Sequence, residues 1–182
     1  MDSFPSLRRF FINTLFDSTF TLLGVIVGSA FVAEPELDVI LGTMITISLG
    51  LGISSGSSVY QAESLEQELK LQKLEKAMLK SLDGSQVAKS AEKCTRITAL
   101  VNLLTPFFTC FLYSIPLLVA LTGVIDVRTG AISSIVVSLI TLMVTGIVIN
   151  KNGKGNPIVK GIKMAGLGGI TFLLGYVVQL LL

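Results

Sequence analysis

The stretch GLGISSGSSVYQAES, which runs from Gly50 to Ser64, decides how this sequence folds. Its first part continues an apolar run, its last part is polar, and no helix breaker separates the two. Between Ser54 and Ser58 it places four serines and a glycine, where a membrane helix would be expected to carry larger apolar side chains. The stretch predicts one long helix that leaves a membrane through a small, hydroxyl-rich section.

The composition of the whole chain indicates an integral membrane protein. Of 182 residues, 51% are hydrophobic and only 14% are charged, and the mean hydropathy is +0.78. These charges are too few to cover a soluble domain of this size. A net charge of +2 without a basic patch argues against nucleic acid as a partner. Cys94 and Cys110 are far apart and are expected to be free thiols.

We predict an all-α, polytopic membrane protein with five transmembrane helices, because a bilayer core about 30 Å thick needs roughly 20 apolar residues of helix. The expected spans are Phe10–Ala33, Val39–Tyr60, Ile97–Val124, Ala131–Asn150 and Ile158–Leu182. Turn residues occupy the short joins, at 34–36, 126–130 and 152–157. The chain thus divides into residues 1–60 with two spans, a polar segment 61–96, and residues 97–182 with three spans.

Positive charges set the expected orientation. Every Lys and Arg except Arg128 falls on one side of the five-span arrangement, whereas the first join is acidic. The amino terminus and the long polar segment are therefore expected in the cytoplasm, and the carboxyl terminus outside. Arg8 and Arg9 before an apolar run could also begin a cleaved signal peptide. That alternative is weaker, because the run is long, contains an aspartate and is needed for a consistent topology.

Asp17 is the most unusual residue of the first span, since an aspartate at depth costs about 2.5–3.5 kcal/mol on insertion scales. One helical face is predicted to carry polar and small residues at spacings of three and four: Asn13, Asp17, Thr21, Gly24 and Gly28. This stripe favours an ion or proton site. The alternative is that Asp17 lies near the cytoplasmic interface, where it caps the helix or reaches toward water.

The serines of the second span are expected at a depth comparable with Asp17. Ser54, Ser55, Ser57 and Ser58 could line a cytoplasmic vestibule together with Asn13, Thr21 and the carboxylate. Simple close packing of small residues is an equally acceptable interpretation. Further polar and small residues occur at helical spacing in the other spans: Asn102, Pro106, Thr109, Tyr113 and Pro116; Ser134, Ser138, Thr141 and Thr145; and Gly161, Ala165 and Gly169. The last two sets are expected to be helix-packing faces.

The polar segment is predicted to be a helical hairpin. Its first arm continues the second span, Asp83-Gly84 ends it, and Ser85 is the expected N-cap of the second arm. Glu66 and Lys70 are spaced to form an ion pair. Glu68, Glu75 and Met78 share another face and could hold a divalent cation, although such charges more commonly serve to solvate a helix.

Several motifs together resemble one family of transporters. DSTFTLLGV at Asp17–Val25, the stretch Gly50–Glu66, IPLL at Ile115–Leu118, and KGIKM at Lys160–Met164 with Gly166 to Gly175 occur in the order expected for the vacuolar iron transporter family. The resemblance implies a homodimer that moves Fe²⁺ or Mn²⁺ out of the cytosol in exchange for protons, with Asp17 as the translocation ligand and no permanent cofactor. It implies metal collection by glutamates of the cytoplasmic helix, for which Glu63, Glu66, Glu68 and Glu75 are available. The chain departs from the family where serine follows Asp17, and where Gly56 and Tyr60 replace a methionine and a glutamate.

The sequence therefore predicts a divalent-cation transporter in a multi-pass membrane protein. The rival hypothesis is a membrane scaffold whose hairpin binds a cytosolic partner and in which Asp17 only pairs or caps. An enzyme is not expected, because histidine is absent and no nucleophile and base share a recognisable motif.

Overall fold

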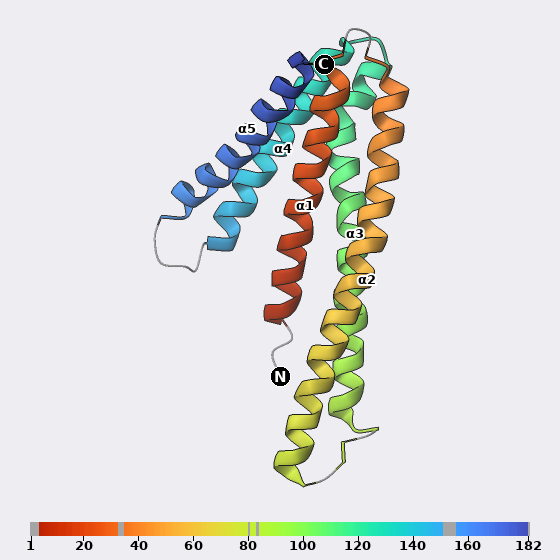
Figure 1. Ribbon diagram of the computed structural model, residues 1–182, viewed down its shortest axis with the longest axis vertical. Coiled ribbons are helices and arrows are strands. Elements are labelled where there is room, and N and C mark those ends of the chain that lie inside the picture. The colour runs from red at the N-terminus through yellow and green to blue at the C-terminus, as the bar shows by residue number, and fades with distance from the viewer. Residues whose placement is uncertain (1–3, 33–34, 80, 83, 151–155, 182) are drawn as a thin grey trace.

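The chain is all-α, as predicted (Figure 1). The computed structural model describes residues 4–32, 35–79, 81–82, 84–150 and 156–181. Within these ranges there are five helices, which are α1 Phe4–Ala30, α2 Leu37–Met78, α3 Gln86–Leu121, α4 Val127–Asn150 and α5 Pro157–Leu181. All five are long and apolar enough to cross a membrane. The prediction of five spans in an integral membrane protein is thus supported in its main feature.

The bounds differ from the sequence prediction chiefly at the first helix. α1 begins at Phe4 and ends at Ala30, whereas the apolar run had been expected to span Phe10 to Ala33. The arginines at positions 8 and 9 lie inside the helix because a charged residue does not interrupt helical hydrogen bonding. The expected join at 152–157 lies mostly outside the described residues, and so does Asp83.

α2 and α3 are longer than the other helices and extend together beyond them (Figure 1). α2 is continuous for 42 residues, which confirms that no break follows the apolar part. It ends at Met78, earlier than the expected stop at Asp83-Gly84, because Leu79 is the C-cap: its φ of 52° is left-handed and its backbone N–H donates to the Glu75 carbonyl. Ser85 is the N-cap of α3 and accepts a hydrogen bond from the Ala88 amide, as predicted.

Close contact between α2 and α3 depends on two glycines. A Cβ at Gly52 would lie 2.7 Å from the Leu103 carbonyl oxygen and 2.9 Å from the Phe107 ring. A Cβ at Gly56 would lie 2.8 Å from Leu103 Cβ. The small residues of the Gly50–Ser64 stretch therefore serve, in part, to bring α2 and α3 together.

α1 lies in the middle of the bundle and is joined to α3 by buried polar groups. Thr14 donates to the Asn102 side-chain oxygen at 2.7 Å, and the hydroxyls of Thr19 and Tyr113 are 2.9 Å apart. Ser134 of α4 donates to the Tyr113 carbonyl at 2.7 Å. These bonds satisfy polar groups that lipid could not satisfy. Ser134 therefore acts in packing, as expected.

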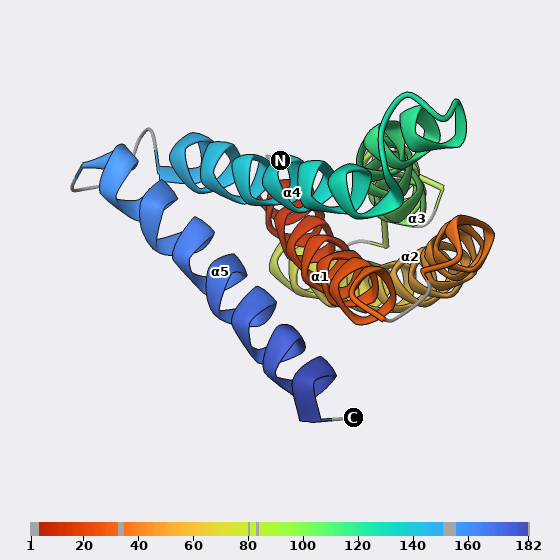
Figure 2. The same ribbon diagram turned by 90° about the horizontal axis from the view of Figure 1, so that it is seen from above.

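α4 and α5 pack on each other near their join, and seen from above α5 runs away from α4 after that contact (Figure 2). Gly161 of α5 packs against α4, because a Cβ there would lie 2.7 Å from the Met143 carbonyl oxygen. Gly168 meets Leu142 and Leu139 in the same way, whereas no atom lies within 4 Å of a Cβ built at Gly169. The expected contact face through Gly169 is therefore wrong by one residue. Gly168 lies seven residues after Gly161, which is close to two full helical turns, so the two glycines share one face. Gly169 lies eight residues after Gly161 and is rotated away from α4.

Candidate functional site

Asp17 lies well inside the apolar part of α1. The candidate span runs from Leu7 to Ala30, so Asp17 is ten residues from one end and thirteen from the other. At 1.5 Å per residue it is about 15 Å along the helix from Leu7. Its side chain is exposed, and Asp17 Oδ2 accepts a hydrogen bond from the Asn13 amide nitrogen at 3.5 Å. Asp17 therefore lies within the candidate span, with a polar neighbour one helical turn away.

Asp17 lines a pocket of about 270 Å³ between α1 and α2. Asn13 and Thr14 stand beside it on α1, and Ser55 and Ser58 face it from α2. The pocket also contains the apolar residues Phe10, Val59 and Ala62. The structure thus brings together the aspartate and part of the serine-rich stretch, as the depth argument predicted.

Two of the four serines do not reach this pocket. Ser57 lines a different pocket, with Tyr60 and Arg96 at the α2–α3 side, and Ser54 is exposed and lies outside the described pocket at Asp17. Thr21 also lies outside it, with its hydroxyl bonded to the Asp17 backbone carbonyl at 2.7 Å. The helical period explains the division, since 55, 58, 59 and 62 share one face of a helix.

The same period could have identified the pocket residues that sequence reasoning missed. Val59 and Ala62 follow Ser55 by four and seven residues, and Phe10 and Thr14 each lie three residues from another pocket residue of α1. Thr14 gave no signal of its own, because threonines are common in apolar helices. In the structure its hydroxyl donates to the Asn102 side-chain oxygen of α3, which holds Thr14 in place at the pocket wall.

The chemistry of the pocket is that of hard oxygen ligands. One carboxylate, one carboxamide and the three hydroxyls of Thr14, Ser55 and Ser58 surround the space, a combination that suits Mg²⁺, Mn²⁺ or Fe²⁺ better than copper. Among the described residues no basic side chain forms an ion pair with Asp17. The described part of the chain also holds no group of three or more His, Cys, Asp or Glu side chains that could bind a metal. Asp17 would therefore be the one charged ligand of a cation among the residues described at this pocket.

Glu66 lies outside this pocket and joins two helices by ion pairs. Its carboxylate is 2.9 Å from Lys70 Nζ and 3.6 Å from the Arg9 guanidinium of α1. The hydrogen bond from Lys70 lowers the pKa of Glu66 most, burial opposes it, and the Lys70 and Arg9 charges lower it further, so the net shift is downward. The side chain therefore has a structural role in this arrangement.

The other proposed metal ligands of the hairpin lie at separate places. Glu63 is fully buried and accepts a hydrogen bond from Gln67 at 2.7 Å, and Glu75 accepts one from the Leu82 amide at 2.7 Å. Glu68 is exposed on a pocket between α2 and α3, and Met78 lines another pocket nearer the end of α2. The structure does not gather Glu63, Glu66, Glu68, Glu75 and Met78 around one point.

Comparison with known proteins gives a relative but no family. No family model matches the chain. The chain is 29% identical over 159 residues to the uncharacterized protein MJ0645 of Methanocaldococcus jannaschii. The aligned region covers 86% of this chain and 80% of that protein. The similarity extends over most of both chains, so it concerns the whole helical arrangement rather than one motif.

Proposed function

We propose that this protein transports a divalent cation, Mn²⁺ or Fe²⁺, across a membrane, and that Asp17 is the ligand through which the ion passes. The observation that carries the proposal is the pocket at Asp17, where a carboxylate inside an apolar span shares about 270 Å³ with Asn13, Ser55 and Ser58. Charged residues inside spans face a bundle interior or a wet path. An exposed carboxylate at this depth needs water or a cation beside it.

The proposal includes the resemblance to the vacuolar iron transporter family. The Asp17–Val25 motif supports it, because its aspartate is the residue that lines the pocket with the serines. In that family the first spans of two copies line the path. We therefore place the Asn13–Asp17–Thr21 stripe, which is exposed in one chain, at the interface of a homodimer.

We propose export from the cytosol, which is the direction that the resemblance implies, and the proposed orientation sets the side from which the ion enters. Lys and Arg are concentrated at the start of α1, in the α2–α3 extension and around the α4–α5 join, which places these parts in the cytoplasm by the positive-inside rule. The Asp17 pocket then opens toward the cytoplasmic half of the span, and the ion leaves the cytosol. The resemblance implies that this export is exchanged for protons, and we include proton coupling in the proposal.

Metal flux into proteoliposomes tests the proposal. Purified protein is reconstituted with a Mn²⁺-quenched dye inside the vesicles, and wild type is compared with Asp17→Asn. Asp38→Asn is the matched control, because Asp38 is also exposed but lies in the first turn of α2, outside the pocket. We expect at least a tenfold loss of flux for Asp17→Asn and none for Asp38→Asn. Equal flux in wild type and Asp17→Asn would remove Asp17 from the mechanism, and a wild type without Mn²⁺ or Fe²⁺ flux would favour a membrane scaffold.

A further inference from the structure

A groove between α2 and α3 lies where these two helices leave their apolar parts. It has a volume of about 470 Å³ and is separate from the Asp17 pocket, with which it shares no residue. The two helices line it together, α2 with Gly56, Ser57, Tyr60 and Gln61, and α3 with Arg96, Ala99, Leu100 and Leu103. We call it the Arg96 groove.

The two ends of the Arg96 groove lie at different depths. A Cβ at Gly56 would lie 3.4 Å from the Ala99 carbonyl oxygen, so these two residues are at the same level. The helices run in opposite directions, and therefore Tyr60 and Arg96 both lie about one turn from that level toward the extension. The apolar runs end there, at the polar segment 61–96. The groove thus extends from the apolar zone to the expected boundary with water.

The chemistry of the groove changes along this direction. Leu100 and Leu103 give its inner end apolar walls, whereas Arg96 and Tyr60 place a cation and a hydroxyl at its outer end. These groups are within reach of a ligand, because Tyr60 is 46% exposed, Leu100 is 56% exposed and the Arg96 side chain is 69% exposed. Tyrosine and long basic side chains are typical of the level of lipid headgroups.

Positive charge continues from the groove along α3. Lys89, Lys93 and Arg96 are spaced by four and three residues, so they share a helix face with Leu100. The one acidic residue between positions 86 and 96 is Glu92, whose carboxylate lies 2.6 Å from the Arg96 guanidinium. A guanidinium has five N–H donors, so this ion pair leaves Arg96 able to bind a phosphate oxygen as well. The outer end of the groove is therefore suited to an anion.

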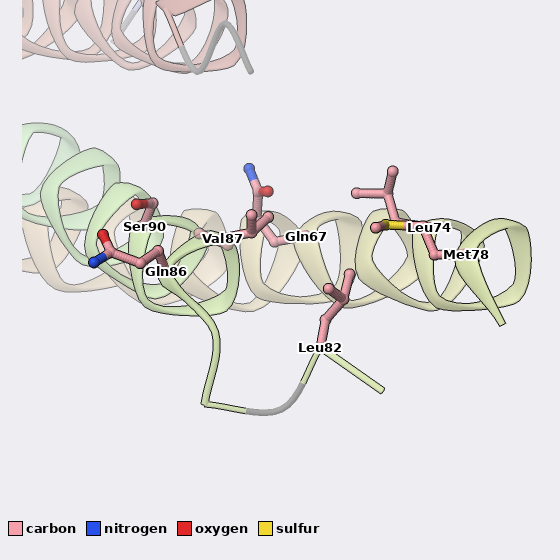
Figure 3. Close-up of a pocket in the computed structure, with 8 residues that line it drawn as sticks. Gln67, Leu74, Met78, Leu82, Gln86, Val87 and Ser90 are labelled. Atoms are coloured by element: carbon pink, nitrogen blue, oxygen red, sulfur yellow. The ribbon is translucent and has the colours of Figure 1, made fainter. Parts of the chain in front are cut away.

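Two neighbouring hollows lack this combination. Figure 3 shows the one at the end of the extension, where Leu74 and Met78 are among the described lining residues and none of these is charged. The other contains the carboxylates of Glu68 and Glu92 and no basic side chain among its described residues, so it would repel an anion. Of the three, the Arg96 groove alone joins a cation to an apolar wall.

We propose that the Arg96 groove binds one anionic phospholipid. The lipid phosphate accepts hydrogen bonds from the Arg96 guanidinium and the Tyr60 hydroxyl, and one acyl chain lies along Leu100 and Leu103. Basic sites beside membrane helices attract anionic headgroups. A zwitterionic lipid offers the same phosphate and chain, but it binds more weakly because its own cation offsets the attraction. The site is independent of metal transport and contacts α2 and α3 at the base of the extension.

A tryptophan in the groove tests the proposal by fluorescence. The chain contains no tryptophan, so Tyr60→Trp supplies a single fluorophore and keeps a hydrogen-bond donor at this position. The full protein is reconstituted in phosphatidylcholine bilayers with increasing fractions of chain-brominated phosphatidylglycerol or chain-brominated phosphatidylcholine, which quench on contact. We expect half-maximal quenching at an about fivefold lower fraction of phosphatidylglycerol, the usual effect of one basic residue at a membrane surface. Leu173→Trp, an exposed position of α5 outside the groove, should be quenched equally by both lipids.

Three further substitutions, each made in the Tyr60→Trp protein, separate headgroup binding from a structural effect. Arg96→Gln should remove the preference for phosphatidylglycerol, and Glu92→Gln should increase it, because the carboxylate that competes for Arg96 is gone. Both substitutions break the same ion pair, so a structural effect alone would move them in the same direction. Lys73→Gln is the charge-matched control, since Lys73 is exposed on the extension and lies outside the groove, and the preference should remain.

Several results would overturn the proposal. Equal quenching of Tyr60→Trp by the two lipids would exclude an anionic headgroup, and an unchanged preference in Arg96→Gln would exclude this site. The same preference at Leu173→Trp would show a general attraction of anionic lipid to the protein. Quenching by neither lipid would show that a protein surface, such as a second copy of the chain, covers the groove.

Discussion

At the residue scale, the consequence of each polar side chain depends on what faces it. The exposed side chain of Asp17 faces a pocket that it shares with Asn13, Ser55 and Ser58. Thr14, three residues earlier in α1, is only 4% exposed, and its hydroxyl donates to Asn102. Both lie in the same apolar helix. Depth in the membrane therefore does not separate a candidate ligand from a packing residue, but side-chain surroundings do.

Thr14→Val should lower the stability of the protein, because it leaves the buried Asn102 oxygen without its donor. We expect a loss of about 0.5–2 kcal/mol, which is the range for hydrogen bonds between membrane helices. Unfolding in mixed micelles with increasing denaturing detergent measures it. Thr43→Val is the control, since the exposed Thr43 hydroxyl bonds only to the Val39 carbonyl of its own helix. Equal losses in the two variants would refute a bond across helices.

At the element scale, α2 combines two roles along its length. Its apolar part packs on α3 through Gly52 and Gly56, and its polar part carries Glu66, which is paired with Arg9 of α1. The first contact is steric and does not depend on pH. The second is electrostatic and does.

Gly52→Ala should destabilise the α2–α3 contact by about 1–3 kcal/mol, because the new methyl group would overlap the Leu103 carbonyl and the Phe107 ring. Gly50→Ala is a matched control on the same helix, since a Cβ there meets no atom within 4 Å. It should be neutral or stabilising by up to about 1 kcal/mol through helix propensity. Thermal unfolding of both variants in detergent measures the difference. Similar effects of the two substitutions would show that α2 and α3 are not in close contact.

The Glu66 ion pairs should contribute to stability at neutral pH and lose their contribution in acid. The pKa of Glu66 is lowered in the folded protein, chiefly by its hydrogen bond with Lys70. The stabilisation is therefore present above the ordinary glutamate pKa and disappears as the pH falls through the lowered value. We expect Glu66→Gln to unfold at a slightly lower temperature than wild type at pH 7, and the difference to shrink as the pH is lowered. The difference should be small, because exposed ion pairs contribute little. A difference that stays the same as the pH is lowered would exclude the ion pairs as its cause.

The fold was more predictable than the detail of the contacts. Apolar runs and caps identified the helices, the α2 extension and the Ser85 cap, because these depend on the local sequence. The rotation of each helix about its axis decides which residues face a neighbour. It explains why the contact with α4 is made by Gly168 and not by Gly169. It also explains why only Ser55 and Ser58 of the four serines line the Asp17 pocket. That rotation is set by neighbouring helices, which one sequence does not reveal. The same applies to Glu66, whose partner Arg9 is far away in the chain.

At the scale of the whole molecule, the helices form a membrane bundle with one asymmetric extension. The start of α1 and the α2–α3 extension lie toward one end, and the end of α5 lies toward the other (Figure 1). α5 buries little of its surface in the chain and carries exposed apolar residues along its length, such as Ile162, Leu173 and Val177. This surface suits lipid or a second copy of the chain.

Cysteine labelling should place the two ends of the bundle on opposite sides of the membrane. In a Cys94→Ser, Cys110→Ser background, Gln72→Cys on the extension and Val124→Cys after α3 are both exposed positions. In intact cells a membrane-impermeant maleimide should label only the Val124→Cys variant, and after lysis it should label both. Labelling of the extension in intact cells would reverse the orientation that the positive charges favour.

Transport through Asp17 requires that water and a cation reach the space beside its carboxylate. The direct measurement is the rate at which an impermeant thiol reagent modifies Ser58→Cys, in the same background, with and without Mn²⁺. We predict modification from the side of the extension, slowing by Mn²⁺, and loss of that slowing when Asp17→Asn is added. A folded protein in which Ser58→Cys is not modified, or is modified at one rate whatever the Mn²⁺ concentration, would contradict the account.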